Sequence, residues 1–499
     1  MAGSYFKDIH AVEEKSISEL ISLLEDGTIT SEELVLAYLE RIAKFDKAGP
    51  CLNAIREINP DALALARVRD AQRKKGEILG PLHGIPVVVK DNIDSGDKMH
   101  TTAGSVALKD HYAEEDAFVI KKLKAAGAII LGKANLTEWA NFIAIGMKNG
   151  HSSLGGDVLN CYGPGKFDVG GSSSGSAVAT GANFAACGIG TETSGSIIMP
   201  ATLASCVGIK PSIGLISRTG IIPLAFTQDT AGPICRTVAD AALMLEVLVG
   251  EDPSDPITYF ARDWEGYPYR EQLDPNGLKG AKLGFLRKVY WDRLDEDGAR
   301  VITQALEVLK KAGAEIVDPV EGFLAADMAP VSISTPAELN VNVLYHEFKV
   351  ALNAYLGKTR SYLPVHNLTE LIEYNVAHKE VALKYGQAHL EIADKTDGSL
   401  ASMEYFASRM QDERVCGKES IDKALDEYGL DALIYPDYFA QTVAARAGYA
   451  SITVPAGYSD EIGPVSLTFV GRKFDEPKLL KLAYAFEQAS KARRAPALE

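Results

Sequence analysis

Two clusters of glycine and serine stand out because their residue types can act on a carbonyl group. They lie within residues 169–201, VGGSSSGSAVATGANFAACGIGTETSGSIIMPA, and are joined by an apolar stretch of small residues with helical character. Glycines let backbone N–H groups approach a bound group closely, and serine hydroxyls can attack a carbonyl or relay a proton. A flexible linker would not enclose an apolar helix or lead into the strand-like CVGIKP. We therefore interpret the segment as a nucleophile with an oxyanion site.

A candidate base precedes this segment in the chain. Lys90 follows the apolar run GIPVVV, which is typical of a buried strand. Burial removes water from the ammonium group and lowers its pKa from about 10.4, so that a neutral amine can accept a proton. The alternative for this position is an ordinary lysine at a strand end, whose charged group reaches the solvent.

Other chemistries have weaker support in the sequence. The run Gly171–Gly175 matches GxSxG, with Ser173 as the nucleophile of an α/β-hydrolase, but CYGPGKFDVG before it does not resemble a strand. The downstream histidines lie in or beside helical patterns. Residues 127–134 match GxxxxGK, but an alanine replaces the magnesium-binding hydroxyl residue, which argues against a phosphate loop. The nine histidines include no close pair at metal-ligand spacing, so we expect no metal.

Strands and helices that alternate along the chain would position these residues. Residues 119–133 and 308–319 each contain an amphipathic helix, a glycine and a short apolar strand. Residues 281–290 supply a strand before the second unit. Such repetition predicts βαβ units and an α/β fold, a mixed and mostly parallel central sheet with helices on both faces. An amphipathic pair of helices is predicted at the start of the chain, with Thr30 or Ser31 as the N-cap of the second.

The chain contains no linker long enough to divide it, so we expect one domain over residues 1–499. The segment that contains most of these motifs covers about residues 80–240. Residues 337–425 are predicted to be a helical excursion, and residues 430–491 return to strands and a last helix.

Composition and charge restrict the partners. The chain has 499 residues and a net charge of −16, with 51 basic and 67 acidic side chains. A field of this sign repels phosphate backbones and anionic lipids, so nucleic acids and membranes are poor partners. Six dispersed cysteines and an N-terminus without a signal-peptide pattern indicate a cytoplasmic protein. No run of residues is apolar enough to predict a membrane helix.

Taken together, these motifs resemble those of the amidase signature family of serine hydrolases. GxPVxVKDN, GGSSSGSA, GTETSGSIxxPA and ITVPAG occur in the family's order across most of the chain. The resemblance implies a Ser–cis-Ser–Lys triad, in which Ser196 is the nucleophile and Ser172, on a cis peptide bond, relays the proton to Lys90. It implies that Ser173 helps to hold Lys90. It also implies an oxyanion hole of four backbone N–H groups, those of Thr193, Ser194, Gly195 and Ser196.

The sequence departs from the common family pattern beside the nucleophile. Ser194 replaces a glycine, and Ile198 replaces an arginine that usually supports the nucleophile together with an acid. With AGSVAL, GKANLTEWANF and FTQDTAGP, the pattern is most similar to that of peptide amidases, which remove a C-terminal carboxamide.

The resemblance therefore implies an amidase that converts a carboxamide to a carboxylate and ammonia through an acyl-enzyme. Its substrate would be a C-terminal peptide amide or a related aryl or aliphatic amide, and it would need no cofactor. We expect a monomer or homodimer. The alternatives are the glutaminase-type subunit of a tRNA-dependent amidotransferase and a non-catalytic relative that only binds amides.

Overall fold

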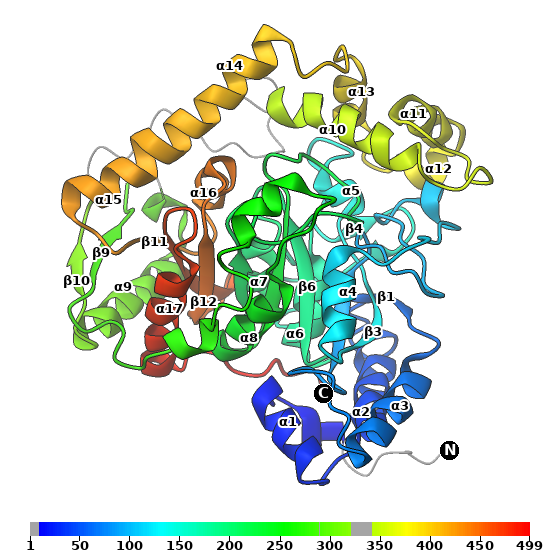
Figure 1. Ribbon diagram of the computed structural model, residues 1–499. Helices are drawn as coiled ribbons and strands as arrows, with labels where there is room; N and C mark the ends of the chain where they lie inside the picture. The colour runs from blue at the N-terminus through cyan, green and yellow to red at the C-terminus, as the bar shows by residue number, and fades with distance from the viewer. Residues whose placement is uncertain (1–8, 289, 321–341) are drawn as a thin grey trace.

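An eleven-stranded sheet forms the centre of the molecule in the computed structural model (Figure 1), which describes residues 9–288, 290–320 and 342–499. The strand order is β1-β3-β2-β6-β8-β7-β12-β13-β11-β9-β10. The strands of the sheet are β1 (Ile55–Ile58), β2 (Pro86–Lys90), β3 (Ile129–Ala134), β6 (Cys187–Glu192), β7 (Val207–Lys210), β8 (Thr230–Cys235), β9 (Lys282–Phe285), β10 (Glu315–Val317), β11 (Ala432–Pro436), β12 (Ser451–Ser459) and β13 (Gly463–Val470). A separate hairpin consists of β4 (His151–Ser152) and β5 (Gly156–Asp157).

The sheet is mixed, as predicted, but it is not mostly parallel. Among the described residues, four of its strand pairings are parallel and six are antiparallel. Two of the four parallel pairings, β2 with β3 and β9 with β10, lie where the sequence predicts βαβ units. The other two join β2 to β6 and β9 to β11. The antiparallel centre includes the hairpin of β12 and β13, which needs no crossover helix. The βαβ patterns predicted the parallel pairs of β2 with β3 and β9 with β10 correctly, whereas the apolar runs elsewhere gave no strand direction.

Helices cover the sheet. Every residue of β2, β3, β6 and β8 is buried, and because alternate side chains point to opposite faces, both faces of these strands are covered. The helices before the long C-terminal excursion are α1 (Ile17–Glu25), α2 (Ser31–Arg41), α3 (Ala62–Lys74), α4 (Phe118–Ala125), α5 (Glu138–Asn141), α6 (Ser174–Gly181), α7 (Ile198–Leu203), α8 (Val238–Leu248) and α9 (Glu296–Lys311). The predicted cap is confirmed, since the Thr30 hydroxyl accepts the Glu33 N–H before α2.

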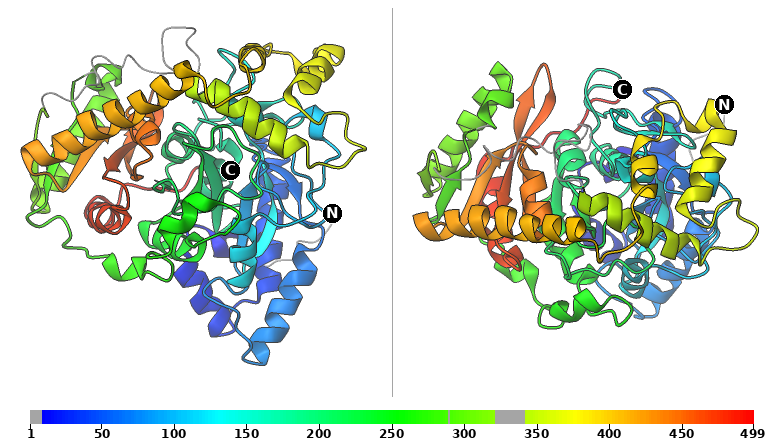
Figure 2. Two further views of the ribbon diagram at one scale, coloured as in Figure 1. Left: turned by 45° about the horizontal axis from the view of Figure 1, so that its top comes forward. Right: turned by 90° about the horizontal axis from the view of Figure 1, so that it is seen from above.

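The predicted helical excursion is present from residue 342 onward, while residues 337–341 lie outside the described residues. Helix α10 (Asn342–Leu356) and the continuous helical run that α14 (Met403–Gln411) begins cross one end of the sheet (Figures 1 and 2). The predicted return to strands and a last helix is confirmed by β11 to β13 and α17. These later helices are α10 (Asn342–Leu356), α11 (Leu368–Ala377), α12 (Lys379–Ala382), α13 (Ala388–Asp394), α14 (Met403–Gln411), α15 (Lys423–Tyr428), α16 (Gln441–Ala447) and α17 (Glu476–Ser490), with a π-helical segment (Asp412–Asp422) between α14 and α15.

Candidate active site

Lys90 is the last residue of β2, as the apolar run before it predicted, and its side chain is completely buried. Its amine donates to the Ser172 hydroxyl at 2.7 Å, to the Thr191 hydroxyl at 2.8 Å and to the Thr191 carbonyl at 3.2 Å. The strand end thus brings the predicted base into contact with the predicted relay serine.

Burial is the main influence on the pKa of Lys90. The loss of hydration lowers that pKa to about 7, against the opposing attraction of Asp229 and Glu192. A substantial fraction of the amine is therefore neutral near pH 7 and can accept a proton. The alternative of a lysine that reaches solvent is wrong for this position.

Ser172 lies in the loop that leads into α6, and the Gly171–Ser172 peptide bond is cis. Two backbone hydrogen bonds hold this loop. The Ser172 carbonyl accepts the Thr137 N–H at 3.0 Å, and the Ser173 N–H donates to the Ser196 carbonyl at 3.2 Å. The second bond joins the two glycine-serine clusters, which are far apart in the sequence.

Ser196 follows a tight turn between β6 and α7, and only 6% of its surface is exposed. The predicted oxyanion residues, Thr193 to Ser196, form this turn. Gly195 has a φ of +92°, a conformation that side chains rarely adopt, and a Cβ there would lie 2.4 Å from Cγ of Gln441. Glycine is therefore required at this point for both conformation and space.

A buried carboxylate lies at each side of this turn, and each one holds the turn by accepting hydrogen bonds. Asp229 accepts the Thr193 hydroxyl at 2.5 Å, and burial raises the pKa of Asp229 to about 6. Glu192 accepts the N–H groups of Ile197 at 2.7 Å and Ile198 at 3.0 Å. The acid of the acid–arginine pair that the family resemblance leads us to expect is thus present and binds the backbone immediately after Ser196, the predicted nucleophile, even though no arginine stands at position 198.

A different cation lies near this acid. Lys210, at the end of β7, is completely buried, and the loss of hydration lowers its pKa to about 8 while Glu192 and Glu476 oppose that shift. Lys210 therefore supplies positive charge to Glu192 from β7, which is separated from β6 by β8 in the sheet. Sequence analysis missed it because β6 and β7 are brought together only by their pairing with β8.

Ser173 does not hold Lys90 directly in the structure. Its hydroxyl donates to the Thr191 carbonyl at 3.0 Å and accepts the Thr191 N–H at 3.2 Å. Because these partners are backbone groups, Ser173 lacks the histidine that an α/β-hydrolase nucleophile requires. Its connection to Lys90 passes through Thr191.

Thr191 is a site residue that the sequence did not reveal. Its hydroxyl accepts hydrogen bonds from Lys90 and, at 3.0 Å, from the Nδ2 group of Asn92. Asn92 and Asp229 stand in the motifs KDN and QDTAGP, but their roles depend on partners from other strands.

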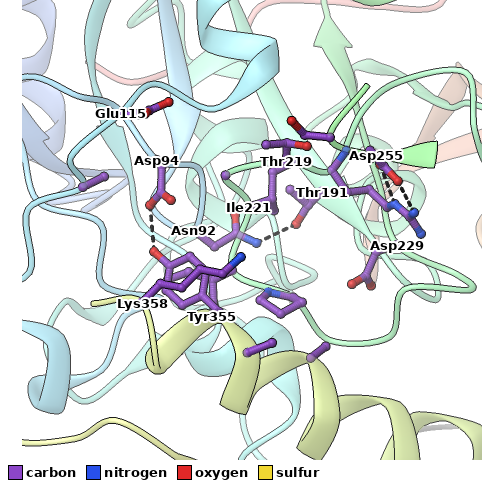
Figure 3. Close-up of a pocket in the computed structure, with 18 of the residues that line it drawn as sticks. Asn92, Asp94, Glu115, Thr191, Thr219, Ile221, Asp229, Asp255, Tyr355 and Lys358 are labelled. Atoms are coloured by element: carbon purple, nitrogen blue, oxygen red, sulfur yellow. Dashed lines mark hydrogen bonds and ion pairs between the residues drawn. The ribbon is translucent and has the colours of Figure 1, made fainter. Parts of the chain in front are cut away.

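A cavity of about 610 Å³ borders this group of residues (Figure 3). Thr191, Thr193 and Asn92 line one end, and residues 351–360 contribute another wall. Figure 3 shows the bond from Asn92 to Thr191 and the bond from Tyr355 to Asp94 at this cavity.

In the described parts of the chain, His, Cys, Asp and Glu side chains form no group of three that could bind a metal ion. The same parts contain no helix that is both long and apolar enough to cross a bilayer.

The fold and the relatives of the chain are those of amide-hydrolysing enzymes. The family model for amidases matches residues 33–480, and the chain belongs to the amidase signature family.

Among solved structures, the native peptide amidase of Stenotrophomonas maltophilia is 41% identical, with a TM-score of 0.89 and coverage of 98% of this chain and 99% of that chain. A probable amidase of Arabidopsis thaliana is 38% identical, over 97% of this chain and 92% of the relative. One glutamyl-tRNA(Gln) amidotransferase subunit, from Thermoanaerobacter pseudethanolicus, is 31% identical, over 96% of this chain and 97% of the relative.

Proposed function

We propose that the protein hydrolyses carboxamides to carboxylate and ammonia through an acyl-enzyme on Ser196, with Ser172 as the proton relay and Lys90 as the base. The observation that carries the proposal is the 2.7 Å hydrogen bond between the buried Lys90 amine and the Ser172 hydroxyl. A serine hydroxyl is a weak nucleophile until a neighbouring base removes its proton. A lysine with a pKa of about 7 is matched to that task at neutral pH.

In the proposed reaction, the Ser196 oxygen attacks the amide carbon while its proton passes through Ser172 to Lys90. The N–H groups of the turn Thr193–Ser196 stabilise the oxyanion, and the fixed backbone of this turn supports that role. The proton then returns to the departing nitrogen, and water hydrolyses the ester by the same route.

For the substrate, we propose a C-terminal peptide amide or a related aryl or aliphatic amide. The 41% identity to a peptide amidase supports this class over a glutaminase-type subunit, for which the relative above is 31% identical. We further propose a cytoplasmic monomer or homodimer.

The test is ammonia release from peptide amides, simple aliphatic and aryl amides, and glutamine, each with a Ser196→Ala control. We expect peptide amides to release ammonia with the wild type and not with the control. Turnover of glutamine alone would favour the amidotransferase alternative, and equal release by the control would remove Ser196 from the mechanism.

A further inference from the structure

A second cavity, of about 380 Å³, lies between the helical excursion and the core of the molecule. The excursion contributes Arg409 of α14 and Lys418 of the π-helical segment. The core contributes Ile213, in the loop after β7, and Ala447, at the end of α16. The three residues of the proposed triad do not line it, so the proposed reaction gives this cavity no role.

Positive charge dominates the lining, although the chain as a whole has a net charge of −16. The described lining residues include four cationic side chains and one acidic side chain. Arg409 pairs with that acid at 2.8 Å, and Arg218, which also lines the larger cavity, pairs with Asp255. The remaining two cations, Lys418 and Lys473, form no ion pair with a described acid. The cavity therefore holds two positive charges with which no described acid is paired.

Lys473 is the more deeply placed of these two lysines. It is half-buried, and its amine lies 5.2 Å from the ring centre of Phe260 and 5.4 Å from that of Phe474. Loss of hydration lowers the pKa of this amine, while the Glu413 carboxylate opposes that shift and the Arg409 guanidinium adds to it. An ammonium group that has lost water and has no carboxylate beside it is stabilised by a bound anion.

The excursion adds two further cationic groups to the lining. One terminal nitrogen of Arg409 pairs with Glu413, whereas the other, Nη1, is buried and has no partner among the described residues. Lys418 is exposed, and the acid that follows it, Glu419, pairs with Arg414 at 3.3 Å. The acids of this segment are thus used by its arginines and leave Lys418 uncompensated.

The neutral polar groups of the lining are already engaged. The Thr227 hydroxyl donates to Glu347 at 2.8 Å, and the Tyr449 hydroxyl donates to Asp422 at 2.8 Å. The two lysines are therefore the donors that remain for a ligand.

Apolar side chains complete the lining and fit a carbon body. Ile213, Ile257 and Phe226 are among them. A volume of about 380 Å³ is larger than an inorganic anion needs and is in the range of pockets that hold small organic molecules.

We propose that this cavity is a binding site for an organic phosphate monoester. Its phosphate group binds between Lys473 and Lys418, and its apolar body lies against Ile257 and Phe226. A phosphate monoester carries a charge of about −1.5 to −2 at pH 7, which matches two uncompensated ammonium groups, whereas a carboxylate carries only one charge. The proposal concerns binding alone and does not depend on the hydrolysis of any amide.

The experiment is isothermal titration calorimetry with phenyl phosphate at constant ionic strength. Inorganic phosphate, benzoate and benzyl alcohol are titrated in parallel, and the melting temperature is recorded with and without each compound. Lys473→Met removes the charge and keeps a long side chain against the aromatic rings. Lys418→Met removes the other charge at an exposed position, so it serves if the first variant does not fold. Lys423→Met, at an exposed lysine of α15 outside the lining, is the matched control.

We expect phenyl phosphate to bind the wild type with a Kd below about 1 mM and to raise its melting temperature. Benzoate and inorganic phosphate should bind at least about fivefold more weakly, and benzyl alcohol should not bind. The Kd for phenyl phosphate should rise at least about tenfold in Lys473→Met and about threefold in Lys418→Met, and it should stay near wild type in Lys423→Met.

Three results would overturn the proposal. One is a Kd that neither Lys473→Met nor Lys418→Met changes, because phenyl phosphate would then bind elsewhere. Another is benzoate or inorganic phosphate binding as tightly as phenyl phosphate, because the cavity would then not recognise an organic dianion. The third is the absence of binding at about 10 mM phenyl phosphate.

Discussion

The amine of Lys90 lies 2.7 Å from the hydroxyl of Ser172, and neither side chain has any exposed surface. Burial leaves the lysine only partly charged, and the short distance gives the serine a direct partner for its proton. This relationship has consequences that kinetics and stability measurements can test.

Replacement of either serine should remove activity without loss of the fold. Ser196→Ala lacks the attacking oxygen and Ser172→Ala lacks the relay, so each should lower kcat by about four orders of magnitude or more. Ser176→Ala is the control, because it removes a buried hydroxyl of α6 that donates to the Ile189 carbonyl. It should cost about 1 kcal/mol of stability and keep most activity. A Ser196→Ala variant with wild-type turnover would place the nucleophile elsewhere.

The rate should depend on pH through Lys90. In the proposed mechanism the neutral amine is the base, so kcat should rise from acid pH and level off above the lysine pKa of about 7. The measurement is kcat from pH 5 to 9 with a primary amide. A flat profile, with acylation shown by burst kinetics to limit the rate, would contradict this role.

The free energy of unfolding should also depend on pH through the buried Lys90. The unfolded chain holds the lysine proton up to about pH 10.4, whereas the folded protein holds it only up to about pH 7. Between these values the unfolded state binds more protons, so raising the pH favours the folded state. Denaturant unfolding should therefore show that wild type gains stability relative to Lys90→Met between pH 7 and about pH 9.5. If the difference in the free energy of unfolding between the two proteins stayed constant over that range, the pKa of Lys90 in the folded protein would be ordinary.

Thr191→Val should change the base without touching the nucleophile. The variant keeps the shape of the side chain but loses the hydroxyl that accepts from Lys90 at 2.8 Å. Because this bond stabilises the charged amine, its loss lowers the lysine pKa, and the midpoint of the pH profile should move about one unit toward acid. A midpoint that stays in place would show that the Thr191 hydroxyl does not help to set the pKa of the amine.

Gly195→Ala should distort the turn before the nucleophile. The added Cβ meets Gln441 at 2.4 Å, and the positive φ adds about 1–2 kcal/mol of strain. We expect kcat to fall far more than KM rises. Gly27→Ala is the control, since Gly27 also has a positive φ but has nothing within 4 Å of its Cβ position. The Gly27→Ala variant should lose stability and keep its activity. If kcat fell equally in both variants, the loss would come from general backbone strain and not from the turn before Ser196.

Local patterns were sufficient to predict much of the fold. The glycine that follows each amphipathic helix and the apolar run after it predicted β2, α4 and β3, and likewise β9, α9 and β10, because periodicity and turn residues act over short range. Outside these two units the apolar runs gave no strand directions, and the antiparallel pairing of β6 with β8 was therefore missed.

The residues of the candidate site likewise divide into those that the sequence indicated and those that only the structure revealed. Residue types directed attention to Lys90 and to the two glycine-serine clusters, and the resemblance to the amidase signature family singled out Ser172 and Ser196 within them. Ser173 was expected to help hold Lys90, and in the structure it bonds the backbone of Thr191, whose hydroxyl accepts from Lys90. Sequence reasoning missed Thr191 because it comes within hydrogen-bonding range of Lys90 only after β2 pairs with β6.

The sequence by itself determined the family, the order of its elements and the chemical identity of the residues available for catalysis. The tertiary structure decided which of them meet, how deeply Lys90 is buried and where the cavity opens. The physical reason is range: backbone propensity and motif spacing are local, whereas the pKa of an amine and the volume of a cavity depend on every segment that packs around them.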